Sequence, residues 1–294
     1  MKKIDFLAKD NVELTGFIYE AKTKNDSIIL SVHGMATNCF KKREDEIIKK
    51  ALEKNIDVFC FNNRGSELVK YIKTGEQKLI GGTAYEDVLD GYNDIVGAIL
   101  KLIELGYKKI YLQGHSLGST KVVYTYNRLI NEKSDILESI KGLILLSLID
   151  IPTTIKIYLK EKFVSYLEYA IEKSSKGLIY EMMPQDAFIH PISVKTFLRY
   201  AKDYEEIDFA KYNENENFEI LNKIQIPIFM RWGNVNEFIL QNAEDLVKLV
   251  ESKIENNMKD ISYIQGATHN YTGKEEILAN HILNYIEKTK KIYK

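Results

Sequence analysis

The stretch "YLQGHSLGSTKVVYTY", residues 111–126, decides how the rest of the chain is interpreted. It places Ser116 between Gly114 and Gly118, where a short apolar run meets a helical one that continues through 117–131. A strand that enters a helix through G-x-S-x-G turns sharply, so the residues two positions from the serine must lack side chains. The pattern predicts that the Ser116 hydroxyl stands at the carboxyl end of a strand, above the N-terminus of a helix.

The composition is that of an ordinary globular protein. The 294 residues are 45% hydrophobic and 28% charged, enough for one large α/β domain or two small ones. Basic and acidic side chains nearly cancel, leaving a net charge of −1, so no electrostatic field points to nucleic acid or an anionic membrane.

No targeting or membrane-spanning segment is predicted. No apolar stretch approaches the ~20 residues that span a bilayer, and no apolar run of a signal peptide follows the first lysines. Cys39 and Cys60 match no zinc-ligand spacing. We therefore expect a cytoplasmic protein with reduced thiols, no metal and no cofactor.

Short apolar runs alternate with longer amphipathic stretches, which indicates a mostly parallel sheet covered by helices. The predicted strands are 12–19, 27–32, 57–61, 109–113, 142–147, 227–232 and 262–264. The predicted helices are 38–54, 84–105, 117–131, 238–252 and 275–290. The first strand alternates between apolar and polar residues, which is typical of an antiparallel strand at a sheet edge.

One segment interrupts this alternation. Residues 151–222 separate two predicted strands, show helical periodicity and are too long for a plain connection. The sequence thus predicts a core of residues 1–150 and 223–294, with 151–222 as an inserted helical cap. We expect some of the cap's many aromatic and methionine side chains to shape an apolar pocket.

A serine hydroxyl is a poor nucleophile unless a base removes its proton. His269 lies in "YIQGATHNYTG" (263–273), between the last predicted strand and the last predicted helix. That is where the base belongs when the partners follow in the order serine, acid, histidine. The remaining histidines are interpreted as turn, cap or helix residues: His33, His115, His190 and His281.

The acid is left open among three residues. Glu237 lies in the loop after the strand 227–232 and ranks first. Asp150, after the strand 142–147, ranks second. A neutral Asn236, standing where an aspartate is usual, ranks third and would only orient the histidine.

Two backbone N–H groups are predicted to form an oxyanion hole. His33 and Gly34 directly follow the strand 27–32, so the next N–H, that of Met35, would face the carboxyl edge of the sheet. The N–H of Leu117, directly after Ser116, would be its partner.

Together these motifs resemble those of the α/β-hydrolase superfamily over almost the whole chain. They are "HGMATN" (33–38), "FNNRGS" (61–66), "GHSLGS" (114–119) and "GATHN" (266–270). The resemblance implies the α/β-hydrolase fold, with the helical lid between the sixth and seventh strands of that fold. It also implies that Arg64 and Gly65 stabilise turns near the oxyanion hole and take no part in catalysis.

A narrower likeness is to a family related to fungal siderophore-ester hydrolases. It is carried by "GGTAYEDVLDGYNDI" (81–95), "PISVKTFLRYAKDYEEIDF" (191–209) and "NEFI" (236–239). In that family the last motif usually begins with an aspartate, where this chain has Asn236.

The predicted activity is hydrolysis of uncharged or weakly charged carboxylic esters of small molecules, through Ser116, His269 and Glu237, by a monomer or homodimer. Thioesterase, amidase and acyltransferase activities use the same constellation. A non-catalytic binding protein on this fold is the remaining alternative, and Asn236 is its best support.

Overall fold

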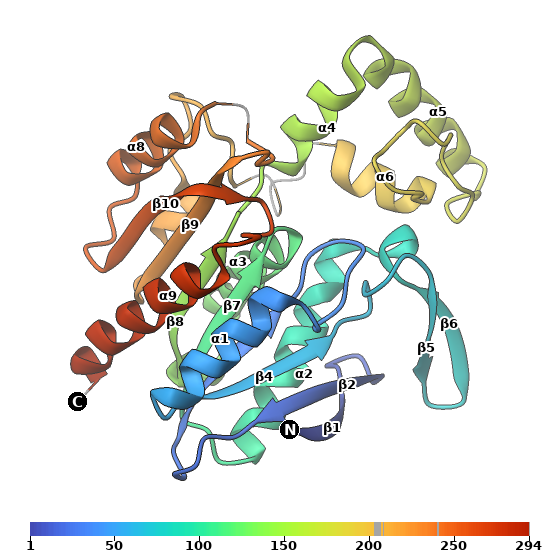
Figure 1. Ribbon diagram of the computed structural model, residues 1–294. Coiled ribbons are helices and arrows are strands. Elements are labelled where there is room, and N and C mark those ends of the chain that lie inside the picture. The colour runs from blue at the N-terminus through green and yellow to red at the C-terminus, as the bar shows by residue number, and fades with distance from the viewer. Residues whose placement is uncertain (203–206, 208, 240, 294) are drawn as a thin grey trace.

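The computed structural model describes residues 1–202, 207, 209–239 and 241–293. Within them, ten strands form one mixed sheet in the order β10-β9-β8-β7-β3-β4-β2-β5-β6, with β1 against β2 (Figure 1). The strands are β1 Lys2–Leu7, β2 Val12–Tyr19, β3 Ser27–Val32, β4 Asp57–Asn62, β5 Lys70–Thr74, β6 Gln77–Gly81, β7 Lys109–His115, β8 Ile140–Leu146, β9 Ile228–Val235 and β10 Lys259–Thr268. The run from β4 to β10 is parallel, and β2 is antiparallel to β1, β4 and β5.

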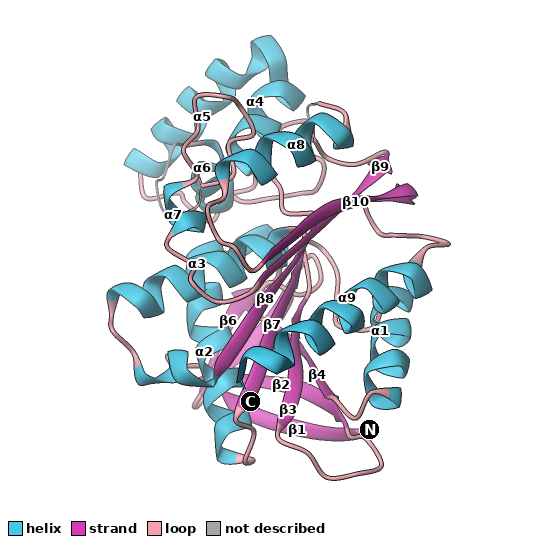
Figure 2. Cartoon of the chain, turned by 90° about the vertical axis from the view of Figure 1, so that its left-hand side faces the viewer, coloured by secondary structure: helices cyan, strands magenta, loops and turns pink. Residues whose placement is uncertain are grey.

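Helices cover both faces of the sheet (Figure 2). They are α1 Lys42–Glu53, α2 Gly91–Glu104, α3 Leu117–Asn131, α4 Ile151–Leu159, α5 Phe163–Ser175, α6 Val194–Ala201, α7 Glu219–Asn222, α8 Ala243–Lys253 and α9 Glu275–Thr289. Helices α1 and α9 share one apolar cluster with one face of the sheet, whereas α2, α3 and α8 share another with the opposite face. The strands between these layers are buried on both faces, which explains their nearly continuous apolar runs.

The predicted strands are all present, but the sequence missed β1, β5 and β6. In β1 only Phe6 is buried, and in β6 only Gly81, so neither strand shows a core-facing apolar pattern. These strands extend the sheet beyond β2. The strand at 12–19 is therefore antiparallel as predicted, but the prediction that it forms the sheet edge is wrong.

Several predicted helices begin too early. The predicted helix 84–105 starts only at Gly91, because residues 83–85 and 88–90 form 3-10 turns. The predicted helix 238–252 starts at Ala243, because the side chain of Asn242 accepts a hydrogen bond from the N–H of Asp245 and caps α8. Residue 240 of this helix and residues 203–206 and 208 of the predicted cap lie outside the described residues.

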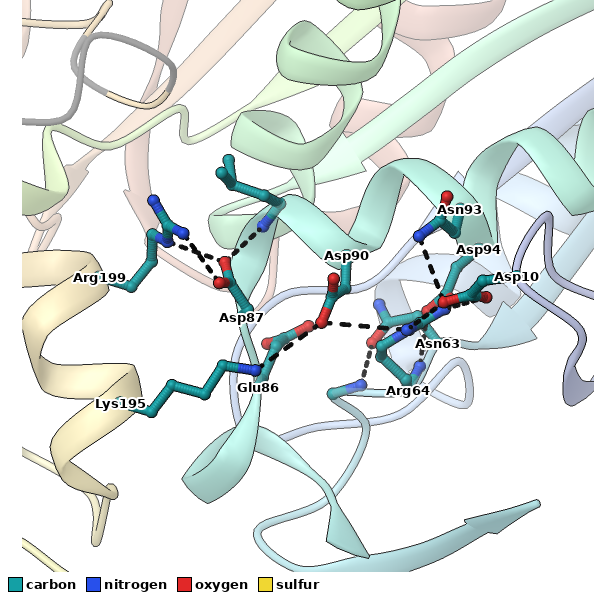
Figure 3. Close-up of polar contacts among 12 residues, drawn as sticks. Asp10, Asn63, Arg64, Glu86, Asp87, Asp90, Asn93, Asp94, Lys195 and Arg199 are labelled. Carbon is teal, nitrogen blue, oxygen red and sulfur yellow. Dashed lines mark hydrogen bonds and ion pairs between the residues drawn. The ribbon is translucent and has the colours of Figure 1, made fainter. Parts of the chain in front are cut away.

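Helices α4, α5 and α6 follow β8 and stand over the carboxyl ends of the parallel strands (Figure 1). Their buried side chains form a third apolar cluster, which includes Ile155 and Phe197 and also Leu117 of α3. Helix α6 is attached to the 3-10 turns before α2. The Thr196 hydroxyl donates to the Glu86 carbonyl at 2.9 Å, and Arg199 pairs with Asp87 at 2.8 Å (Figure 3).

A buried ion pair holds the loop after β4 against α2 (Figure 3). Arg64 donates from Nε to Asp94 at 2.8 Å and from Nη2 to Asp10 at 2.7 Å. Asp94 is fully buried, and its second oxygen accepts the backbone N–H of Arg64 at 2.8 Å. These neighbouring carboxylates raise the pKa of Arg64 in spite of its burial.

Asp94→Ala should lower the free energy of unfolding by about 3–5 kcal/mol, because it leaves a buried guanidinium with the exposed Asp10 as its hydrogen-bonded partner and removes the acceptor of the Arg64 backbone N–H. Urea denaturation measures the change. The matched control is Asp5→Ala, which removes an exposed pair with Lys3 and should leave the free energy of unfolding nearly unchanged. Equal losses in the two variants would contradict the role given to the buried pair.

Candidate active site

Ser116 sits at the junction of β7 and α3 with a backbone that few non-glycine residues adopt, φ 55° and ψ −124°. A Cβ on Gly114 would lie 2.4 Å from the carbonyl oxygen of Gly118, and one on Gly118 would lie 2.2 Å from that of Val32. Only glycine fits at either position. The turn therefore brings the first turn of α3 against the end of β3.

His269 follows the last residue of β10, and its Nδ1 contacts the carboxylate of Glu237. On the other side, the ring of Phe238 meets it edge-on, with ring centroids 4.7 Å apart. His269 and Ser116 line the same cavity at the carboxyl edge of the sheet. These side chains come from elements far apart in the sequence, and the parallel strands bring them together.

The Glu237 carboxylate is held from several strands at once. Its Oε2 accepts the Gly233 backbone N–H at 2.8 Å and the Ser147 hydroxyl at 2.9 Å, while Oε1 faces His269. The side chain is only 1% exposed. A buried carboxylate satisfied in this way fixes the orientation of the imidazole that it contacts.

The other two acid candidates are placed differently. The carboxylate of Asp150 accepts the Thr153 N–H at 3.0 Å and caps α4. Asn236 has φ 49° and lines a different cavity, together with Asn234. The left-handed backbone at Asn236, which asparagine tolerates well, directs the next residue, Glu237, toward the histidine.

The two predicted oxyanion donors belong to the loop after β3 and to the start of α3. Met35 is in the loop after β3 and lines the cavity. This loop is fixed by Thr83, whose hydroxyl accepts the Ala36 N–H at 2.7 Å and donates to the Gly65 carbonyl at 2.9 Å. Leu117 is the first residue of α3, so its N–H is one of those that a helix leaves without an internal acceptor.

Three residues that sequence reasoning did not assign hold the site together. The His115 Nε2 donates to the His269 carbonyl at 2.7 Å, and burial, as the main cause, keeps the pKa of His115 well below its usual value. The Tyr271 hydroxyl lies 3.0 Å from that of Ser147 and donates to the Arg231 carbonyl at 2.8 Å. Of these three residues, Ser147 could have been found from the sequence, because it directly follows a buried parallel strand whose end borders the site.

The cavity has a volume of about 580 Å³ and both apolar and basic side chains in its lining. Its apolar lining is made by Met35, Ile149, Ile151, Ile155, Tyr158, Phe188, Ile189 and Phe238. Basic and imidazole side chains also line it: Lys41, Lys42, Arg43 and His190. Helix α4 thus contributes much of the apolar wall, and the start of α1 contributes the basic part.

Within the described parts of the chain, no group of three or more His, Cys, Asp or Glu side chains is arranged to hold a metal ion. Of the helices that can be described, none has the length and apolar character needed to cross a membrane.

Solved structures establish the fold. Est1E from Butyrivibrio proteoclasticus, solved with ferulic acid bound, superimposes with a TM-score of 0.68 at 16% identity, over 97% of this chain and 99% of that one. The alpha/beta hydrolase GrgF from Penicillium sp. sh18 gives 0.68 at 16% identity, covering 98% of each chain. An esterase from Pyrococcus furiosus gives 0.62 at 16% identity, over 98% of this chain and 90% of that one. The chain therefore has the α/β-hydrolase fold, as its motifs predicted.

Neither the models of protein families nor the curated proteins provide a match to this sequence. The structural likeness extends over nearly the full length of the chain, while the identity is low. Any activity must therefore be argued from the residues of the site.

His33 supports the loop that carries Met35, and it should remain neutral well below pH 6. Its Nδ1 donates to the Gly34 carbonyl at 2.8 Å, and its Nε2 accepts the Asn63 N–H at 3.2 Å. Complete burial, aided by the charge of Lys121, lowers the pKa of His33 from 6.5 to about 3.

The His33 ring signal in NMR should not titrate between about pH 7 and about pH 5 in the folded protein. In urea-unfolded protein it should titrate near 6.5. Between the two pKa values, His33 thus binds a proton in the unfolded state but not in the folded state. Above pH 6.5 the contribution of the neutral His33 ring to the free energy of unfolding is complete. As the pH falls from 6.5 toward 3, the free energy of unfolding decreases by up to about 1.4 kcal/mol per pH unit. A folded-state midpoint near 6.5 would contradict the buried neutral ring.

Proposed function

We propose that the protein is a serine hydrolase acting on carboxylic esters, with Ser116 as nucleophile, His269 as base and Glu237 as acid. The observation that carries the proposal is the placement of Ser116, on a strained turn above a helix N-terminus, in the same cavity as an imidazole whose Nδ1 contacts a buried carboxylate. This is the arrangement of roles by which a serine hydroxyl is activated.

The chemistry would run in two halves. The Ser116 oxygen attacks the ester carbonyl carbon while its proton passes to Nε2 of His269. The carbon–oxygen bond to the alcohol then breaks, and the departing oxygen takes that proton, which leaves an acyl-serine. Water attacks the acyl carbon, gives a proton to the same nitrogen, and the proton returns to the serine oxygen as the acid departs.

Negative charge that develops on the carbonyl oxygen would be stabilised by the N–H groups of Met35 and Leu117 and by the N-terminus of α3. The backbone supplies these donors, so the side chains at both positions are free to serve packing. The hydrogen bonds through Thr83 and His33 fix the loop that presents the Met35 N–H.

The segment 151–222 would act as the lid, with α4 providing an apolar wall for one part of the substrate. We propose esters, and not thioesters or amides, as the substrates. One of the similar structures has ferulic acid bound, and another is described as an esterase. A non-catalytic role is disfavoured, because Glu237 contacts His269 although Asn236 replaces the usual aspartate.

Wild-type protein should be labelled by a fluorophosphonate probe and should hydrolyse a short-chain 4-nitrophenyl ester. Ser116→Ala should lose both properties, because the probe and the ester react at the same hydroxyl. Gel fluorescence and absorbance measure the two. Absence of labelling and of turnover in folded wild-type protein would favour the binding-protein alternative.

The acid assignment is tested by a matched pair of isosteric variants. Glu237→Gln should lower kcat by about 10²–10⁴-fold, because an amide can no longer stabilise the imidazolium. Asp150→Asn should mainly affect stability, by about 1 kcal/mol or less, through the cap of α4. Steady-state kinetics and thermal denaturation of both variants decide between them. A collapse of kcat in Asp150→Asn with full activity in Glu237→Gln would reverse the assignment.

A further inference from the structure

The cavity that holds Ser116 and His269 is basic at the start of α1. Lys41, Lys42 and Arg43 are consecutive in the sequence, and all of them line it. Glu275 is the one acidic residue in its described lining, and it lies 3.7 Å from Lys42. Glu275 thus offsets Lys42, and Glu44 pairs with Arg43, so Lys41 is the one of these three cations without an ion pair to a described residue.

Arg43 is the unusual member of this group, because its side chain is only 4% exposed. Its Nε and Nη2 both donate to a single oxygen, Oε1 of Glu44, at 3.2 and 2.8 Å. Arg43 Nη1 makes no hydrogen bond to a described residue and is not among the buried polar atoms without a partner, so it keeps contact with solvent where the residue borders the cavity. A guanidinium has five N–H donors, so Arg43 retains donors that Glu44 does not use.

Arg43 lines the same cavity as Ser116 and His269. Burial is the main cause of the low pKa of His115, and the charge of Arg43 is the next. The rings of His115 and His269 have their centroids 4.8 Å apart. Lys41, exposed at the rim, has no ion pair with any described residue, and its charge adds to the causes that lower the pKa of His33.

We propose that this part of the cavity, formed by Arg43 and Lys41, binds a carboxylate of the substrate, so that the protein acts on esters that carry a negative charge. The proposal rests on the proposed hydrolase function and replaces the expectation of uncharged or weakly charged esters. A carboxylate accepts paired N–H donors in the plane of a guanidinium. Because the Arg43 side chain is only 4% exposed, its attraction to a carboxylate is less screened by water than that of an exposed cation.

Two pairs of esters test whether the carboxylate that the site binds belongs to the acyl part or to the alcohol part of the substrate. Mono(4-nitrophenyl) adipate and 4-nitrophenyl hexanoate differ by a charge on the acyl part. The hexanoates of 3-carboxy-4-nitrophenol and 4-nitrophenol differ by a charge on the alcohol part. After correction for alkaline hydrolysis rates, kcat/KM should favour the charged member of at least one pair by about tenfold. This preference should fall as ionic strength rises from about 0.01 to about 1 M, because the Debye length shrinks from ~30 to ~3 Å.

Two variants test the residues. Lys41→Glu reverses an exposed charge with little risk to the fold. Arg43→Met combined with Glu44→Gln removes the buried pair together, so that no lone carboxylate remains buried. Each should lower the ratio of charged to neutral kcat/KM about tenfold. Lys78→Glu, on the distant strand β6, should keep the wild-type ratio. No preference in wild type, or a preference that survives both variants, would overturn the proposal.

Calorimetric binding of adipate to Ser116→Ala protein separates this proposal from the hydrolase function. Adipate binding that Lys41→Glu abolishes supports the carboxylate site even if no ester is hydrolysed by the wild type. Hydrolysis of neutral esters with neither adipate binding nor a preference for either charged ester leaves the hydrolase function intact and rejects the carboxylate site.

Discussion

The close approach of backbone to backbone around Ser116 is the constraint on which the rest of the site depends. Gly114 and Gly118 let the start of α3 pack against the ends of β7 and β3 with no room for a Cβ. The unusual backbone of Ser116 costs roughly 1–3 kcal/mol. It persists because the surrounding sheet holds it, with the Ser116 N–H bonded to the Leu146 carbonyl at 2.8 Å. Strain at this one residue sets the hydroxyl above the helix N-terminus.

The groups around this turn are positioned by different strands of one parallel sheet. Ser147 follows β8, Glu237 follows β9 and His269 follows β10, and a chain of hydrogen bonds joins them. Because parallel strands end at the same edge, small polar groups far apart in sequence meet without a long loop. The buried carboxylate then has a donor for each oxygen, which makes it a rigid support for the imidazole.

Two parts of the chain line the cavity, the segment that follows β8 and the loops at the carboxyl edge of the sheet. Helix α4 supplies apolar side chains, while the start of α1 brings Lys41 and Arg43. The 3-10 turns before α2 connect the two parts. Thr83 holds the loop after β3, and Asp87 pairs with Arg199 of α6 (Figure 3). The motif "GGTAYEDVLDGYNDI", which the sequence singled out without a role, is thus the segment that joins α6 to the loop after β3.

The sequence by itself determined the fold, because buried parallel strands are continuous apolar runs and the turn at Ser116 requires glycine on both sides. The sequence did not predict β1, β5 and β6, because their side chains are mostly exposed and do not form an apolar pattern that faces the core. It ranked Glu237, Asp150 and Asn236 without separating them. Only tertiary structure shows which carboxylate reaches His269, because that contact depends on strand register and on the left-handed backbone at Asn236. The burial of Arg43 could likewise not be predicted from the sequence, since the residues that pack over a charged side chain decide whether it is buried.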